Sequence, residues 1–202
     1  MVRLARLLGR HRTTIALWCG ALALLLGLRA SVADHYRVPS GSMLPTVQIG
    51  DRVLVNKLAY GLRLPLTHTW LVRGAGPAVG DVVVLDAPDE DKVLLKRVVA
   101  VGGDTLEVRA GELILNGRVQ PLERRDGELV ELLAGRAHPV RVDRGGGPDD
   151  GPRRIPRGHV FLLGDNRGDS RDSRFFGPVP VERILGKAER IHWRGGPSWH
   201  DL

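Results

Sequence analysis

Residues 80–104 read GDVVVLDAPDEDKVLLKRVVAVGGD, two short runs rich in valine and leucine joined by an acidic turn. Runs of this length, bounded by glycine, aspartate and proline, are typical of β-strands. Three further segments have the same character: DRVLVNKL (51–58), DTLEVRAGELILNGRVQ (104–120) and GHVFLLGDN (158–166). Within residues 104–120, Asn116-Gly117 predicts a hairpin turn. The sequence therefore predicts a mainly β domain.

The positive charge is concentrated at the N-terminus. The 202-residue chain has a net charge of +7, and five arginines lie in its first 33 residues, which contain no acid: Arg3, Arg6, Arg10, Arg12 and Arg29. Removing these five charges leaves +2 for residues 34–202, an ordinary balance. The basic character therefore indicates membrane topology, and we expect no nucleic-acid partner.

One segment has the composition of a membrane span. Residues 13–28 carry no charge, and only Arg29 interrupts the stretch to residue 33. As a helix, residues 13–33 would reach roughly 31 Å, about the thickness of a bilayer core. The four arginines that precede this segment place the N-terminus in the cytoplasm. We predict a cytoplasmic tail and transmembrane anchor over residues 1–33 and an extracytoplasmic domain over 34–202, in a single-pass protein of the cytoplasmic (inner) membrane.

A cleaved signal peptide is the alternative for this segment. The sequence SVA (31–33) before Asp34 offers the small residues that such a site needs. The uncleaved anchor is favoured because Arg29 falls in the cleavage region and a serine motif follows closely. Cys19, the single cysteine, also lies in this segment, which excludes a disulfide and thiol catalysis within the exported domain.

Two segments differ from the short apolar strands. Residues 121–156 are charged and include RGGGPDDGPRR (144–154), which predicts a small inserted lobe. Residues 58–71, LAYGLRLPLTHTWL, are apolar with few charges. They are interpreted either as a loop that dips into the bilayer surface or as a buried loop.

A pair of serines follows the apolar segment, in VPSGSMLPT (38–46). Ser40 and Ser42 flank Gly41 between two prolines, a pattern that by itself is typical of an ordinary turn. Catalysis by a serine needs a base. The seven histidines are scattered without metal-ligand spacing, and neither G-x-S-x-G nor S-x-x-K surrounds Ser42.

Lysine usage suggests where a base could lie. The chain has 26 arginines and only four lysines: Lys57, Lys92, Lys96 and Lys187. Arginine cannot lose its proton in a protein, whereas lysine can. In a chain that uses arginine almost everywhere, a lysine is therefore a candidate for a role that requires deprotonation. Lys96 shares a predicted strand face with three apolar residues, a setting that lowers a lysine pKa: Leu94, Val98 and Ala100. A lysine that snorkels from an amphipathic strand is the alternative, and Lys57 is the rival base or a structural ion-pair partner.

Four segments in order after one membrane segment resemble the conserved boxes of a known family. They are PSGSMLPT (39–46), GDRVLVNKLAYG (50–61), GDVVVLDAP with LLKRVVAVGGD (80–104), and LGDNRGDSRDSRFFGPVP (163–180). In this order they resemble the bacterial type I signal peptidases, membrane-bound serine proteases that remove signal peptides from exported proteins. The resemblance runs from about residue 36 to residue 186, apart from the inserted lobe.

The resemblance implies roles for the serine pair and for one lysine. Ser42 would be the nucleophile and Lys96 the general base of a Ser/Lys dyad, forming an acyl-enzyme that water then releases. The backbone N–H of Ser42 and the hydroxyl of Ser40 would form the oxyanion hole.

The last segment would support the base. By position, Ser170 matches the family serine that hydrogen-bonds the lysine. Asp172 and Arg174 match a structural ion pair, and Asp165 belongs to the same supporting loop.

These expectations combine into one prediction. The fold is a mainly β, signal-peptidase-like catalytic domain with a small inserted lobe, behind one N-terminal transmembrane helix. The protein is a monomer that cleaves signal peptides of preproteins after small-x-small (Ala-x-Ala) sites beside the lipid bilayer, with no cofactor and no metal. The alternatives are a relative with a narrow substrate range and a non-catalytic anchored β-domain that binds an envelope partner.

Overall fold

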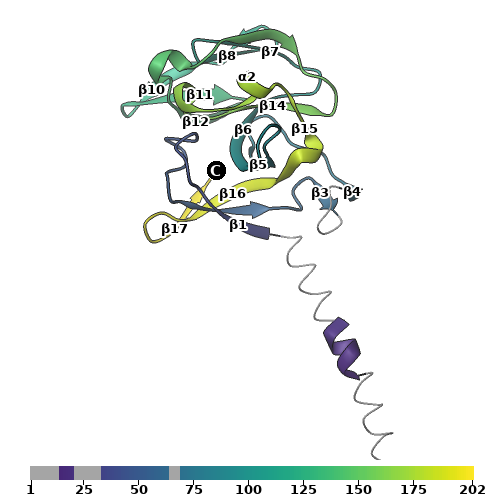
Figure 1. The fold of residues 1–202 in the computed structure, drawn as a ribbon. Coiled ribbons are helices and arrows are strands. Elements are labelled where there is room, and N and C mark those ends of the chain that lie inside the picture. Colours follow the sequence, from purple (N-terminus) through teal and green to yellow (C-terminus); the bar gives the residue numbers. More distant parts are fainter. Residues whose placement is uncertain (1–13, 21–32, 64–68) are drawn as a thin grey trace, which may run out of the picture.

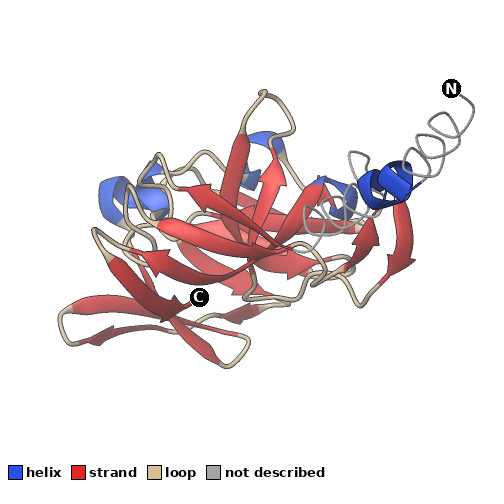
Figure 2. Ribbon diagram, turned by 90° about the horizontal axis from the view of Figure 1, so that it is seen from below, coloured by secondary structure: helices blue, strands red, loops and turns tan. Residues whose placement is uncertain are grey.

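The computed structural model describes residues 14–20, 33–63 and 69–202, and most of the described chain is β-structure (Figures 1 and 2). The main sheet has eight strands. Seven of them lie in the order β1 (Ala33–Arg37), β2 (Arg52–Asn56), β16 (Ile184–Trp193), β5 (Val82–Asp86), β6 (Val93–Val101), β14 (His159–Leu163) and β15 (Val179–Pro180). The eighth, β17 (Pro197–Asp201), pairs with β16. Every neighbouring pair in this sheet is antiparallel.

Three smaller sheets complete the fold. One contains β13 (Asp150–Arg154), β7 (Thr105–Arg109), β8 (Glu112–Leu115) and β9 (Arg118–Val119); another contains β10 (Leu122–Arg125), β11 (Glu128–Leu133) and β12 (Arg136–Val140). The third is the hairpin of β3 (Gly61–Arg63) and β4 (Trp70–Arg73). Figure 1 shows β7, β8 and β10–β12 at one end of the domain, with β1 and β17 at the other.

The range 121–156, predicted to be an inserted lobe, is divided between two sheets. Strands β10–β12 form a sheet of their own, whereas β13 pairs with β7. Below, "the β10–β12 sheet" means residues 122–140.

Helices are short in the described part of the chain. They are η1 (Asp143–Gly146), η2 (Arg167–Asp169), α2 (Ser173–Phe176) and η3 (Val181–Arg183), besides helical residues 14–20. The predicted transmembrane segment 13–33 lies mostly outside the described residues. Among those that are described, no helix combines the length and the apolar character needed to cross a bilayer.

The strands predicted from sequence are present. Segments 51–58, 80–87, 92–101 and 158–166 contain β2, β5, β6 and β14, and segment 104–120 contains β7, β8 and β9. Asn116 and Gly117 join β8 to β9 with φ of 52° and 75°, as a two-residue hairpin turn with positive φ at both positions requires. The mainly β prediction is confirmed.

The serine turn, residues 38–47 between β1 and β2, rests on the hydrophobic core. Val38, Met43 and Val47 are buried in a cluster with valines of β2 and β5 and with Ile191 of β16. The two serines therefore project from a backbone whose apolar neighbours are anchored on both sides. A second cluster joins Leu133 of β11 to Phe161 and Leu163 of β14, so the β10–β12 sheet shares its core with the main sheet.

Leu133→Ala should lower the free energy of unfolding by about 3 kcal/mol, because it removes buried methyl groups and leaves a cavity between two sheets. The measurement is chemical denaturation, with one transition expected because the core is shared. Val119→Ala is the control: its side chain is 59% exposed and should change the free energy by less than about 0.5 kcal/mol. A Leu133→Ala effect as small as that of the control would contradict the shared core.

Candidate active site

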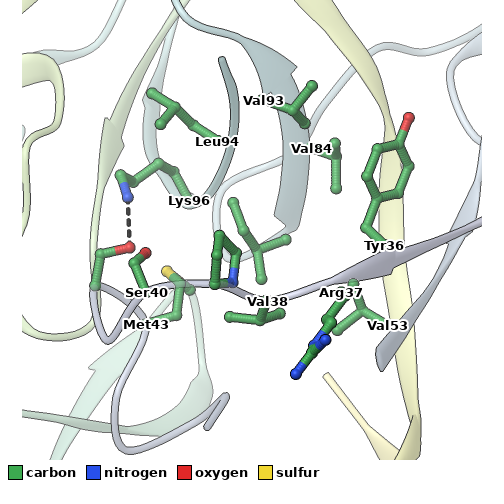
Figure 3. A pocket seen from close by; sticks show the side chains of 13 residues that line it. Tyr36, Arg37, Val38, Ser40, Met43, Val53, Val84, Val93, Leu94 and Lys96 are labelled. Atoms are coloured by element: carbon green, nitrogen blue, oxygen red, sulfur yellow. Dashed lines mark hydrogen bonds between the residues drawn. The ribbon is translucent and has the colours of Figure 1, made fainter. Parts of the chain in front are cut away.

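Ser42 and Lys96 meet although 54 residues separate them in sequence. Lys96 Nζ and Ser42 Oγ are 2.7 Å apart and form a hydrogen bond. Ser42 comes from the turn between β1 and β2, and Lys96 from the middle of β6, where it pairs with Val83 of β5. In Figure 3 the Lys96 amine points at the serine hydroxyl, with the Ser40 hydroxyl beside it.

The environment of Lys96 favours its neutral form. The residue is only 2% exposed, and burial lowers its pKa to about 8. The carboxylates of Asp172 and Asp165 oppose this shift, and Arg174 adds to it. The lysine can therefore lose its proton near neutral pH, which an ordinary surface lysine cannot do.

The other three lysines have different surroundings. Lys57, the rival base, forms an ion pair with Asp34 at 2.9 Å. Lys92 is exposed and pairs with Glu90, and Lys187 pairs with Asp81 at 2.6 Å. All four lysines are described, and Lys96 alone is buried. The geometry thus selects Lys96 over Lys57 as the amine beside Ser42.

Residues 164–174, here called the catalytic loop, pack directly against the serine turn. The backbone N–H of Asn166 donates to the Ser42 carbonyl at 3.1 Å, and Asn166 Nδ2 donates to the Gly41 carbonyl at 3.0 Å. Gly164 permits this approach, since a Cβ there would collide with the Ser42 carbonyl and with Ser170 Oγ. Glycine and asparagine of the GDN sequence therefore fix the backbone at Ser42.

Two buried ion pairs hold the catalytic loop. Asp172 and Arg174 pair at 2.8 Å with both side chains inaccessible to solvent, and Asp172 also accepts from the Gly164 N–H at 3.0 Å. Asp165 receives two hydrogen bonds from Arg97, each 2.8 Å long. Burial alone would raise the pKa of Asp165, but Arg97, together with His138 and Thr46, outweighs burial and lowers it. The ion pair expected between Asp172 and Arg174 is present.

Ser170 is placed differently from its expected role. Its Oγ is buried near Gly164 and has no hydrogen-bond partner among the described residues. The expected hydrogen bond between Ser170 and Lys96 is therefore not formed in this structure, and a supporting role for Ser170 stays a prediction.

A cavity of about 230 Å³ adjoins the dyad. Its walls include Ser40, Ser42 and Lys96 at one end, and Figure 3 shows Tyr36 and Arg37 at the other. Most of the remaining wall is apolar: Val38, Met43, Val53, Val84, Leu94 and Leu95. The cavity can therefore take small apolar side chains within reach of the Ser42 hydroxyl.

Several residues of this site were not predicted from the sequence. Arg97 and Asn166 lie inside the quoted segments, next to Lys96 and Asp165, yet neither was singled out. Arg97 could have been noticed as a second charge beside the lysine of an apolar strand. Asn166 could have been noticed as the amide side chain of the GDN sequence. Thr46 was also missed; its hydroxyl donates to Asp165 at 2.6 Å.

Comparison with known proteins places the chain in a family. Residues 11–193 match the family described as "Signal peptidase, peptidase S26". A signal peptidase I of Pseudomonas fluorescens is 35% identical over 200 residues, which cover 88% of this chain and 70% of that protein. A signal peptidase I of Pseudomonas aeruginosa is 36% identical over 208 residues, covering 89% and 70%.

A solved structure of a signal peptidase I from Enterococcus faecalis is 27% identical, covers 55% of this chain and 95% of its own, and has a TM-score of 0.40. The family match spans nearly the whole chain, and both Pseudomonas relatives exceed 30% identity. The chain therefore belongs to the signal peptidase I family, peptidase family S26, whose members remove signal peptides from exported proteins.

Proposed function

We propose that the chain cleaves signal peptides with a Ser/Lys dyad formed by Ser42 and Lys96. Ser42 Oγ attacks the scissile carbonyl carbon while the neutral Lys96 amine takes the hydroxyl proton. The C–N bond then breaks, and the leaving amine receives that proton from Lys96. A water molecule, deprotonated in turn by Lys96, then attacks the carbonyl carbon of the ester that joins the signal peptide to Ser42. The bond between that carbon and Ser42 Oγ breaks, Lys96 returns the proton to Ser42 Oγ, and the signal peptide leaves with a new carboxyl group.

The contact of 2.7 Å between Lys96 Nζ and Ser42 Oγ supports this proposal most strongly. The distance suits proton transfer, and burial lowers the pKa of the amine so that the neutral form is accessible. The Ser42 backbone N–H and the Ser40 hydroxyl form the proposed oxyanion hole. The Ser40 side chain supports this role because it lines the same cavity as Ser42.

The cavity also supports a preference for small-x-small sites. In an extended peptide, alternate side chains point to the same face, so the residues one and three positions before the cut enter the same region. A mostly apolar cavity of about 230 Å³ suits two small side chains such as alanine. The middle residue points away and is less restricted.

Sheet pairing around residue 33 supports an uncleaved N-terminal anchor over residues 13–33. Ala33 and Asp34 already belong to β1, where they pair with Asn56 and Val55 of β2. A peptidase binds its substrate as an extended strand, so the bond after Ala33 is protected by sheet pairing. A separate observation concerns residues 58–71: Leu71 and Val72 of β4 are 56% and 61% exposed, which favours contact of this segment with the bilayer surface over a buried loop.

The detergent-solubilised protein should cut a preprotein after an Ala-x-Ala sequence, as located by intact mass. Ser42→Ala should abolish this cut while the circular dichroism of the protein is unchanged. Ser40→Ala should lower kcat about a hundredfold or more, the usual effect of losing one oxyanion donor. Cleavage by Ser42→Ala at the wild-type rate would refute the dyad.

The pH dependence should report on Lys96. The pKa of about 8 means that the ammonium form predominates below pH 8 and cannot accept a proton, so kcat/KM should rise with pH through about 8 and then level off. Lys96→Arg should show no measurable turnover, because guanidinium stays protonated. Lys57→Arg is the matched control and should retain most activity, since it preserves a cation beside Asp34. An active Lys96→Arg enzyme would exclude lysine as the base.

The protein isolated from cells should retain its original N-terminus and require detergent for extraction. N-terminal sequencing and membrane fractionation measure both properties. If Asp34 is the main N-terminus, SVA is a processing site and the anchor proposal is wrong.

A further inference from the structure

The β10–β12 sheet contacts the catalytic loop through its backbone. The N–H of Arg141, which follows β12, donates to the Asp165 carbonyl at 2.8 Å. The N–H of Arg167 donates back to the Arg141 carbonyl at 2.7 Å. The end of β12 therefore runs beside the centre of the catalytic loop, with Arg141 and Asn166 paired in parallel orientation.

Buried polar side chains reinforce this contact. Glu131 of β11 and His138 of β12 are cross-strand partners, and both are buried. Glu131 accepts two hydrogen bonds from Arg167, at 3.0 and 2.6 Å, with both side chains inaccessible to solvent. His138 Nε2 lies 3.3 Å from Glu131 and 3.8 Å from Asp165, so it sits between the two carboxylates.

Glu131 remains ionised at neutral pH despite its burial. Burial by itself would raise its pKa, but Arg167 and His138 outweigh burial and lower the pKa to about 2. Buried ion pairs add little net stability, because the cost of desolvating both charges offsets their attraction. The β10–β12 sheet is already attached to the main sheet through the apolar contacts of Leu133. The charged contact therefore calls for a role other than attachment.

The catalytic loop transmits this contact to the nucleophile. Asn166 lies between the two residues held from the β10–β12 sheet, Asp165 and Arg167, and it donates both hydrogen bonds to the serine turn. Thr46, at the end of that turn, bonds to Asp165 at 2.6 Å and to the Pro139 carbonyl of β12 at 3.3 Å. A shift of the loop would therefore move Ser42 relative to Lys96.

We propose that Glu131 and His138 are positioning residues for the peptidase reaction. Through Arg167 and Asp165 they hold the catalytic loop in the arrangement that keeps Ser42 Oγ against Lys96. The β10–β12 sheet thus acts on the chemical step rather than on substrate binding. This inference rests on the proposed dyad.

Glu131→Gln tests the proposal in the full-length, detergent-solubilised protein. It keeps the size of the side chain but leaves Arg167 without its carboxylate. Because a displacement of about 1 Å can cost roughly a hundredfold, kcat should fall about ten- to a hundredfold. KM should stay within about twofold, since neither Glu131 nor Arg167 lines the cavity beside the dyad. Both constants are measured well below the unfolding midpoint of each variant, so that a loss of stability does not lower kcat.

Glu123→Gln is the matched control. Glu123 lies in the same sheet, on β10, and pairs with Arg125 at the surface. This variant should keep the wild-type kcat and KM. His138→Gln, which retains the Glu131–Arg167 pair, should lower kcat less than Glu131→Gln does, again with little change in KM.

The pH dependence of kcat/KM gives a second test, because a loss of stability alone would not change the pH at which kcat/KM rises. The charges that act on Lys96 are Asp172, Asp165 and Arg174, and Asp165 and Asp172 also interact with Arg167. Without the Glu131 carboxylate, the positive charge of Arg167 offsets more of the negative charge of Asp165 and Asp172. These two carboxylates then stabilise the Lys96 ammonium less. The rise of kcat/KM should therefore move to lower pH in Glu131→Gln and stay in place in Glu123→Gln.

The outcomes separate this inference from the proposed function. A wild-type protein that does not cut, or a Ser42→Ala protein that does, refutes the dyad itself. With an active wild type, folded Glu131→Gln and His138→Gln proteins whose kcat lies within twofold of wild type refute only the positioning role. Failure of both variants to fold would also overturn the positioning role, because the two residues would then be required for the stability of the fold.

Discussion

The Lys96 amine is buried against the Ser42 hydroxyl, and the surrounding structure must accommodate a group that water would otherwise hold as an ammonium. Burial makes the neutral form accessible, which a general base requires, but it also disfavours the protonated state that follows proton transfer. The carboxylates of Asp172 and Asp165 oppose this effect from the catalytic loop. The amine is thus placed where both of its protonation states can be reached.

The side chains that hold these carboxylates are arginines. Arg97 pairs with Asp165, Arg174 with Asp172, and Arg167 with Glu131, all in buried positions. Guanidinium stays protonated at any pH at which the fold exists and presents two parallel donors to a carboxylate. The arginines around the buried lysine therefore keep a constant charge, while the lysine itself can gain or lose a proton.

The catalytic loop connects three parts of the molecule. Its glycine and asparagine contact the serine turn, its aspartates bind arginines, and its backbone pairs with Arg141 beyond β12. Met43 and Val47 also anchor the serine turn, because their side chains are buried in the core. Ser42 is therefore constrained from two sides, as catalysis by a dyad of fixed geometry requires.

The sequence alone predicted the β character of the domain, and its resemblance to a known family indicated the pair of residues at the candidate site. Valine-rich segments bounded by glycine and aspartate identified β2, β5–β9 and β14, because local alternation and turn chemistry suffice for short strands.

Strand β16 was not predicted from the sequence, although it lies between β2 and β5 in the main sheet. Register shifts at Ala188/Arg190 and at Ile191/Trp193 break its period of two, so its buried residues do not alternate along the whole strand. Residue type made Lys96 a candidate base, because it is a lysine in an apolar strand of an arginine-rich chain, but it left Lys57 as a rival and the serine pair as an ordinary turn. The pairing of Ser42 with Lys96 came from the resemblance to a known family. The charges around Ser42 and Lys96 could not be predicted from the sequence, because the pairs Arg97–Asp165 and Arg167–Glu131 join residues 68 and 36 positions apart that meet only in the folded chain. The same holds for Ser170, whose hydroxyl lies near Gly164 and unpaired among the described residues, because the packing of the loop and not its sequence spacing sets the direction of that side chain.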